Sequence, residues 1–186
     1  METNMSTERW EIDSSRSGIR FAVRHLVLSK TRGRFSRWSG TAMVPDGDVT
    51  RATLDVVIDA SSIDTGVVRR DQHLRSADYF DVARYPRITF TTRDVSAEPE
   101  GRLRVVGTLT IKGVTRHVTL AVMPNGRALE PSGKQRVGFS ATTSIDRRKF
   151  GFTGNPALDT GGVVIGERID VEIEVEAVRQ SAVRAA

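Results

Sequence analysis

The sequence contains no cysteine among its 186 residues. This absence excludes disulfide bonds, thiolate zinc ligands and a cysteine nucleophile. Histidine is also scarce, with three residues, and no apolar run approaches the ~20 residues that a membrane-spanning helix needs. A zinc site would therefore have to combine His25 or His117 with several carboxylates. The sequence predicts no metal site, no cofactor and no catalytic residue.

The first ten residues are polar and charged, and they lack the basic end and the apolar stretch of a secretory signal. We therefore expect a soluble protein of the cytoplasm. The net charge is +5 and the pI is near 10.2, which raises the question of an anionic partner such as nucleic acid. The basic residues are spread along the chain and interleaved with acidic ones, so we expect a generally basic, solvated surface and no nucleic-acid partner.

The densest basic cluster is Arg147-Arg148-Lys149. It could face the anionic head groups of a membrane, but a cluster this short gives only weak attraction. We favour a solvated turn beside Phe150, with at most transient contact between the protein and a membrane surface.

Apolar and polar residues alternate over most of the chain, which is the period of strands with one wet and one dry face. Segment 169–175 shows it most clearly, because Ile, Val, Ile and Val are separated by Asp, Glu and Glu. Turn signals such as Pro45-Asp46-Gly47 punctuate the runs and predict successive antiparallel hairpins. Closure into a barrel of about eight strands would remove the sheet edges and leave room for side chains or one ligand. The pattern alone fits a filled sandwich equally well.

One stretch breaks this period. Residues 68–84 carry apolar residues at wider spacing, with Asp71 and Arg75 four positions apart in the order that favours an ion pair on a helix face. Thr65 is placed to cap a helix that begins soon after it. We expect one or two short helices here, inserted between strands. We also expect the stretch from Asn155 to Gly162 to be a long exposed connection.

The same stretch carries the most distinctive motifs: Arg70-Asp71-Gln72-His73-Leu74, Asp78-Tyr79-Phe80-Asp81 and Tyr85-Pro86-Arg87-Ile88-Thr89-Phe90. Together with Gly107-Thr108-Leu109-Thr110-Ile111-Lys112-Gly113 and Phe150-Gly151, they resemble the signature of the YceI-like polyisoprenoid-binding family, in matches that run over nearly the whole chain. The resemblance implies an all-β, extended antiparallel, lipocalin-like barrel as one domain over residues 9–180, with tails at 1–8 and 181–186. It also implies an apolar tunnel for an isoprenoid chain or a similar long amphiphile. Lys149 departs from the family, where an acid is common, and could alter which head group is accepted.

Ten apolar residues are predicted to face inward, as tunnel lining or as plain core: Phe21, Val23, Phe35, Val56, Leu74, Phe80, Phe90, Leu109, Phe139 and Phe150. Arg70, Asp71 and His73 are candidates for holding a polar head at a barrel mouth, since an arginine fork suits a phosphate or carboxylate. Arg70 and Asp71 could instead make structural pairs that pin the helical insert to the sheet, which is the interpretation we favour.

The predicted function is non-catalytic binding, storage or transport of a polyisoprenoid or a similar long-chain amphiphilic lipid. Two alternatives remain: an enzyme acting on a small apolar substrate in the same cavity, and a basic anion-binding module. The sequence has neither a Gly-x-Ser-x-Gly elbow nor a Gly-rich phosphate loop to support a reaction. Edge-to-edge pairing of two barrels into a homodimer also remains open.

Overall fold

The computed structural model describes residues 6–26, 29–154 and 165–181. The expected connection from Asn155 to Gly162 lies outside these residues. Their strands are β1 (Thr7–Ile12), β2 (Gly18–His25), β3 (Ser29–Phe35), β4 (Trp38–Pro45), β5 (Thr53–Asp59), β6 (Ile63–Asp64), β7 (Arg87–Ala97), β8 (Leu103–Ile111), β9 (Val114–Leu129), β10 (Gln135–Asp146) and β11 (Ile165–Arg179). The helical elements are α1 (Val68–Arg75) and the 3-10 turns η1 (Val49–Arg51), η2 (Ala60–Ser62), η3 (Pro99–Gly101) and η4 (Arg147–Phe150).

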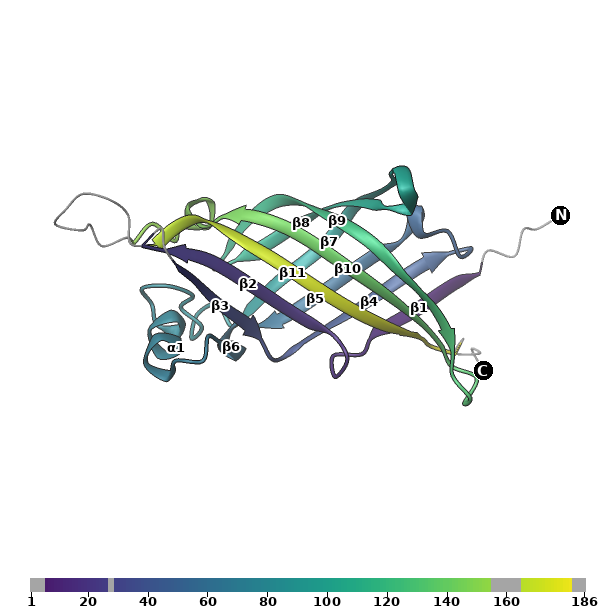
Figure 1. Ribbon diagram of the computed structural model, residues 1–186, viewed down its shortest axis with the longest axis horizontal. Coiled ribbons are helices and arrows are strands. Elements are labelled where there is room, and N and C mark those ends of the chain that lie inside the picture. Colours follow the sequence, from purple (N-terminus) through teal and green to yellow (C-terminus); the bar gives the residue numbers. More distant parts are fainter. Residues whose placement is uncertain (1–5, 27–28, 155–164, 182–186) are drawn as a thin grey trace.

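The strands form one antiparallel sheet that closes on itself (Figure 1). Eight strands make the ring in the order β1, β4, β5, β7, β8, β9, β10 and β11, and β11 returns to β1. β11 pairs with two strands along this edge, because residues 177–179 pair with β1 and residues 165–174 pair with β2. β2, β3 and β6 thereby lengthen the barrel toward the end that carries α1 (Figure 1). The predicted extended antiparallel barrel is confirmed.

Cross-strand register gathers the apolar positions on the inner face. Ala141 of β10 lies opposite Ile173 of β11 and opposite Val122 of β9. The next position, Thr142, lies opposite Glu172 and is exposed. Because side chains alternate between the two faces, a slip of one residue would turn the acids of β11 into the barrel. Burial of one face therefore fixes the register.

Three apolar clusters hold the barrel together. The first lies toward α1 and joins barrel residues such as Trp38 to Phe150 and Phe152. The second includes Trp10 and packs β1, β4, β10 and β11 together. The third, around Phe90, joins β7, β8 and β9. Both ends and the middle of the barrel thus have an apolar core of their own.

The helical insert is anchored differently from the expectation. The residue that precedes α1 makes no side-chain capping bond, so the predicted Thr65 cap is wrong. Thr65 instead bonds Asp71, while Arg75 donates to the carbonyls of Ser61 (2.7 Å) and Ile63 (2.8 Å). These contacts replace the predicted Asp71–Arg75 pair and tie α1 to the η2–β6 segment. Within the described ranges, no helix is long and apolar enough to cross a bilayer.

Candidate functional site

The inner face of the barrel is apolar but is not fully covered by its own side chains. Val171, Ile173 and Val175 of β11 face inward and remain only partly buried, as do Val56 and Leu109 on the other side of the ring. In a barrel packed to ordinary density, inward side chains of this kind would be almost inaccessible. A ring of about eight strands can hold one small guest in place of such packing. The interior therefore retains accessible apolar surface.

Seven of the ten predicted lining residues occupy inward strand positions: Phe21, Val23, Phe35, Val56, Phe90, Leu109 and Phe139. Phe150 lies on η4 in the first cluster, where it is 2% exposed. Phe80 follows α1 and packs on the same cluster. Leu74 lies on α1 and is partly buried, outside the three clusters formed by the described residues. Contact of these residues with a ligand remains a prediction.

A run of aromatic rings links the barrel interior to the helical insert. Phe21 and Phe35 have ring centroids 5.7 Å apart, Phe35 and Phe80 6.1 Å, and Phe80 and Phe152 5.0 Å. Sequence reasoning missed Phe152, although it lies two positions from Phe150 and offers the same signal. The rings form a continuous apolar path at the α1 end.

The predicted polar candidates are engaged with the protein itself. The Asp71 carboxylate, 6% exposed, accepts hydrogen bonds from the Thr65 amide (3.0 Å) and the Thr65 hydroxyl (2.6 Å). Arg70 donates to the Thr65 hydroxyl (2.7 Å) and carbonyl (2.9 Å). His73 Nε2 lies 3.2 Å from an Asp78 carboxylate oxygen. These contacts support the pinning interpretation for Arg70 and Asp71, while a head-group role for the three residues remains a prediction.

The other histidines lie apart from this group. His25 ends β2, and His117 lies at an outward position of β9. Across the described ranges, no three His, Asp or Glu side chains gather as a metal site.

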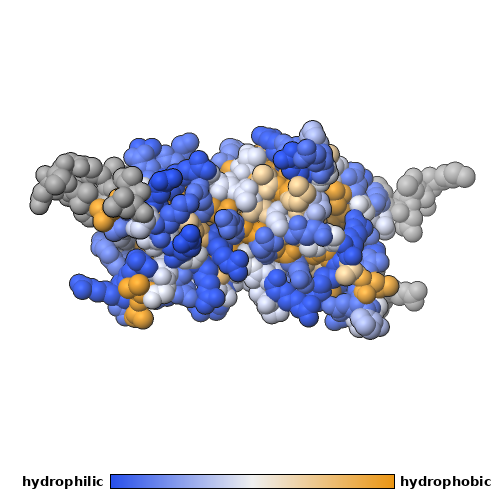
Figure 2. Space-filling view, viewed as in Figure 1, coloured by the Kyte–Doolittle hydropathy of each residue, from blue (hydrophilic) through white to orange (hydrophobic). Residues whose placement is uncertain are grey.

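β9 and β10 part before either strand ends. They pair from Ala121 and Thr142 toward their common turn, whereas residues 114–120 of β9 and 143–146 of β10 have no ladder between them. In the described part of the chain, a hydrogen bond from the Thr143 hydroxyl to the Thr119 carbonyl, at 2.7 Å, crosses this seam. A pocket of about 480 Å³ lies at the opening. In Figure 2, apolar surface shows through hydrophilic residues on the middle of the face that β9 and β10 cross.

The lining of this seam pocket combines apolar and charged residues. Leu120 and Phe150 belong to the apolar clusters of the interior, whereas Arg116 and Lys149 are exposed cations. Asp146 also lines the pocket. Its pKa is lowered to about 2, chiefly by a hydrogen bond from the Arg148 side chain, so this carboxylate is already engaged.

A second pocket, of about 400 Å³, lies over β2, β3, β10 and β11. The β2–β3 hairpin beside it carries five exposed outward cations: Arg20, Arg24, Lys30, Arg32 and Arg34. Register places Arg20 opposite Arg34 and Arg24 opposite Lys30. Arg34 binds Asp64 at 3.0 Å, and within the described parts of the chain the other four cations make no ion pair. On the other side of β2, Glu172 of β11 lies opposite Arg20. These five cations form what we call the basic hairpin face, which has the acids of β11 beside it.

The short basic cluster of η4 divides into three separate roles. Arg147 is 7% exposed and donates to four backbone carbonyls, including those of Gly154 (3.1 Å) and Gly166 (2.9 Å). Arg148 pairs with Asp146 and Glu167, and Lys149 is exposed. The predicted solvated turn is thus wrong for Arg147, which instead organises the start of β11.

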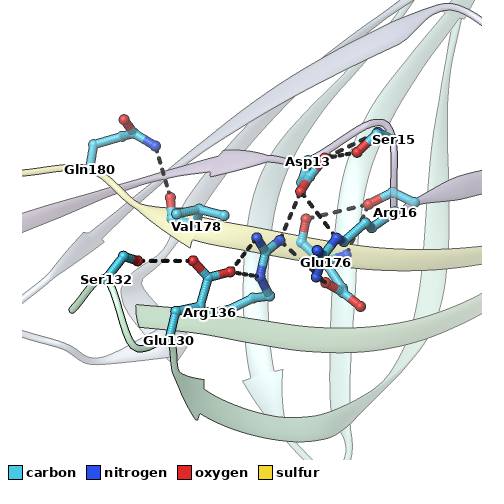
Figure 3. Close-up of polar contacts among 10 residues, drawn as sticks. Asp13, Ser15, Arg16, Glu130, Ser132, Arg136, Glu176, Val178 and Gln180 are labelled. Atoms are coloured by element: carbon cyan, nitrogen blue, oxygen red, sulfur yellow. Dashed lines mark hydrogen bonds and ion pairs between the residues drawn. The ribbon is translucent and has the colours of Figure 1, made fainter. Parts of the chain in front are cut away.

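The barrel end near β1 carries a network centred on Arg136 (Figure 3). Its guanidinium lies 2.7 Å from Glu130, 2.9 Å from Asp13 and 3.2 Å from Glu176. Hydrogen bonds from Ser15 and then Arg136 lower the pKa of Asp13, and the bond from Arg136 lowers that of Glu130. The hydrogen bonds of Arg136 to Asp13 and then to Glu130 raise the pKa of its own guanidinium. This network stabilises the end of the barrel away from α1.

Comparison with known proteins identifies relatives of the whole barrel. A family model described as YceI-like domain matches residues 10–177. A UPF0312 protein of Staphylococcus aureus strain USA300 is 36% identical over 165 residues, 88% of this chain and 94% of the relative. The solved YCEI protein of Campylobacter jejuni is 31% identical with a TM-score of 0.70, over 85% of this chain and 90% of that one. A polyisoprenoid binding domain of Saccharophagus degradans shares the fold at 18% identity, with a TM-score of 0.64 over 90% and 97% of the two chains.

Proposed function

Because the chain belongs to the YceI-like family, we propose that it binds, stores or transports a polyisoprenoid or a similar long-chain amphiphilic lipid inside its barrel, without catalysis. One observation carries this proposal: inward apolar side chains such as Ile173 and Leu109 stay partly accessible although the sheet is closed. The description of the Saccharophagus degradans structure as a polyisoprenoid binding domain agrees with it.

The driving force would be burial of the lipid chain, worth roughly 25 cal/mol for each Å² of apolar surface removed from water. This force depends on area and hardly on chain chemistry. We therefore expect affinity to rise with chain length, and selectivity between isoprenoid and fatty chains to be modest.

We further propose that loading and release occur at an anionic membrane surface, through transient contact. The basic hairpin face supports this, because clustered cations attract anionic head groups. Leu26, at the tip of the same hairpin, is 40% exposed, and Val68 at the start of α1 is 73% exposed. The β2–β3 hairpin and α1 lie at the same end of the barrel (Figure 1), where these apolar side chains could touch the membrane.

The experiment is native mass spectrometry of the purified protein and of its organic extract, followed by titration with geranylgeraniol. Bound ligand should raise the melting temperature, because it binds the folded state alone. Ala141→Trp would fill the interior between Ile173 and Val122 and should weaken uptake. Val57→Trp, on the exposed face of β5, is the matched control and should bind as the wild type. Protein that carries no amphiphile and neither binds geranylgeraniol nor gains stability from it would refute the carrier function.

A further inference from the structure

We infer that the seam pocket between β9 and β10 holds the anionic head of the amphiphile, a phosphate or carboxylate, while its chain passes between the two strands into the barrel. This inference rests on the proposed function and adds the head-group chemistry and the site of access. Three features of the seam carry it: the open ladder, the apolar floor and the cations at its mouth.

The ladder opens between two ordered strands. Residues 143–146 of β10 pair on their other edge with residues 168–171 of β11, and residues 114–120 of β9 pair with β8. Neither strand is frayed, so the opening is a separation of two regular edges. Such edges present backbone N–H and C=O groups that need partners from water or a ligand. The wall of the barrel is therefore interrupted at this place.

The floor of the seam pocket is continuous with the interior. Leu120 belongs to the cluster around Phe90, and Phe150 belongs to the cluster that includes Trp38. Ile145, which also lines the pocket, packs against this second cluster. A chain that enters here would meet the same apolar side chains that line the barrel. A site for a free anion would not need such a floor.

The mouth carries cations that make no ion pair with a carboxylate of the described residues. Arg116 lies opposite Leu109, at an inward position of β9, yet it is exposed, because β10 does not cover it. Its one hydrogen bond within the described chain goes to the Thr115 carbonyl at 2.9 Å. Arg104 and Lys149, both exposed, make no ion pair within the described ranges. Asp146 is engaged by Arg148, which leaves Glu98 as the other carboxylate in the lining.

Three cations around an apolar opening suit an anion that is attached to a chain. Arginine offers paired donors to a phosphate or carboxylate, and lysine adds a point charge. The same charges would not favour an uncharged alcohol head. Head-group charge is therefore the variable that separates this site from the general apolar interior.

The test compares geranylgeranyl pyrophosphate, geranylgeraniol and inorganic pyrophosphate by calorimetric titration. Arg116→Ala/Lys149→Ala should weaken the affinity for geranylgeranyl pyrophosphate roughly tenfold or more. The affinity for geranylgeraniol should stay within about twofold of the wild-type value. Arg127→Ala/Lys134→Ala removes the same charge from exposed positions on the β9–β10 hairpin, and should change neither ligand.

Three outcomes would overturn the inference without touching the carrier function. One is an equal loss of affinity for both lipids in Arg116→Ala/Lys149→Ala, and another is an unchanged affinity of that variant for geranylgeranyl pyrophosphate. Inorganic pyrophosphate that binds the wild type as tightly as the lipid would also overturn it, by showing an anion site without a chain. Failure of the wild type to bind either geranylgeraniol or geranylgeranyl pyrophosphate, in protein that also carries no amphiphile, would instead refute the carrier function itself.

Discussion

The ring of Phe90 on β7 lies directly against the bare Cα of Gly107 on β8. A Cβ placed on Gly107 would be 2.3 Å from Phe90 Cζ and 2.7 Å from the Thr91 carbonyl oxygen. The carbonyl belongs to the paired backbone and cannot turn aside. Gly107→Ala should therefore displace the ring and lower the free energy of unfolding by about 1–3 kcal/mol, the range for overpacked cores. Urea unfolding followed by tryptophan fluorescence would measure this loss.

Gly18→Ala is the matched control for this substitution. Gly18 also lies in a strand, but no atom comes within 4 Å of its added Cβ. Its replacement should change stability by less than about 0.5 kcal/mol. If Gly107→Ala were equally harmless, the close approach of Phe90 would not be a constraint on the fold.

The alternation of residues 169–175 made the inner face of β11 predictable, because a period of two leaves a single way to bury it. The basic hairpin face was not predictable in this way. Arg20 and Arg34 lie on different strands, far apart along the chain, and the register of β2 and β3 sets them opposite each other. The site likewise depends on tertiary placement. The sequence places Arg147 in a short basic cluster, which predicts a solvated side chain. Its carbonyl partner Gly166 is distant in sequence, so the buried position was not predictable.

Asp71 should matter for stability more than for ligand uptake. Asp71→Ala leaves the Thr65 amide and hydroxyl without their acceptor in a partly buried position. An unsatisfied group of this kind costs about 1–3 kcal/mol, so the free energy of unfolding should fall by that amount. Chemical unfolding and a geranylgeraniol titration of the same variant would separate the two roles.

Asp78→Ala provides the comparison, because the His73–Asp78 pair is exposed and should contribute little. A folded Asp71→Ala protein that keeps its stability but loses geranylgeraniol would contradict the pinning role, and would restore Asp71 as a ligand contact.

The Arg136 network should make the protein sensitive to acid. The folded-state pKa values of Asp13 and Glu130 are lowered, so their contribution to stability is complete above about pH 5. It begins to decline near the unfolded values of about 4 and is lost as pH falls through the lower folded-state values. Arg136→Met removes the bonds from Arg136 while the Ser15 bond to Asp13 stays. The variant should be less stable at neutral pH, and its stability should fall less steeply on acidification. Thermal melts between pH 3 and pH 7 would show both effects.

The control for this prediction is Arg9→Met, which breaks an exposed pair with Glu11. It should leave both the melting temperature and its pH dependence close to the wild type. Parallel acid curves for wild type and Arg136→Met would mean that the network does not set the acid response.

The basic hairpin face should bind anionic membranes. Arg24 and Lys30 lie opposite each other at the outer end of the hairpin, where like charges destabilise the sheet unless an anion comes between them and neutralises them. Arg24→Glu/Lys30→Glu should therefore weaken the affinity for vesicles of phosphatidylcholine and phosphatidylglycerol roughly tenfold or more, as measured by co-sedimentation. Arg127→Glu/Lys134→Glu makes the same change in net charge at a distance from this face and should have a much smaller effect.

Two further measurements distinguish a membrane from other anions. Vesicles of phosphatidylcholine alone should bind neither the wild type nor either variant, since the attraction depends on surface charge. A duplex oligonucleotide would compete through phosphate contacts, with an affinity that falls steeply as salt is raised. If the oligonucleotide bound more tightly than the anionic vesicles and lost affinity in Arg24→Glu/Lys30→Glu, the basic hairpin face would be a nucleic-acid surface. The exposed Leu26 at its tip favours the opposite result, because an apolar side chain gains free energy at a membrane interface and none against a phosphate backbone.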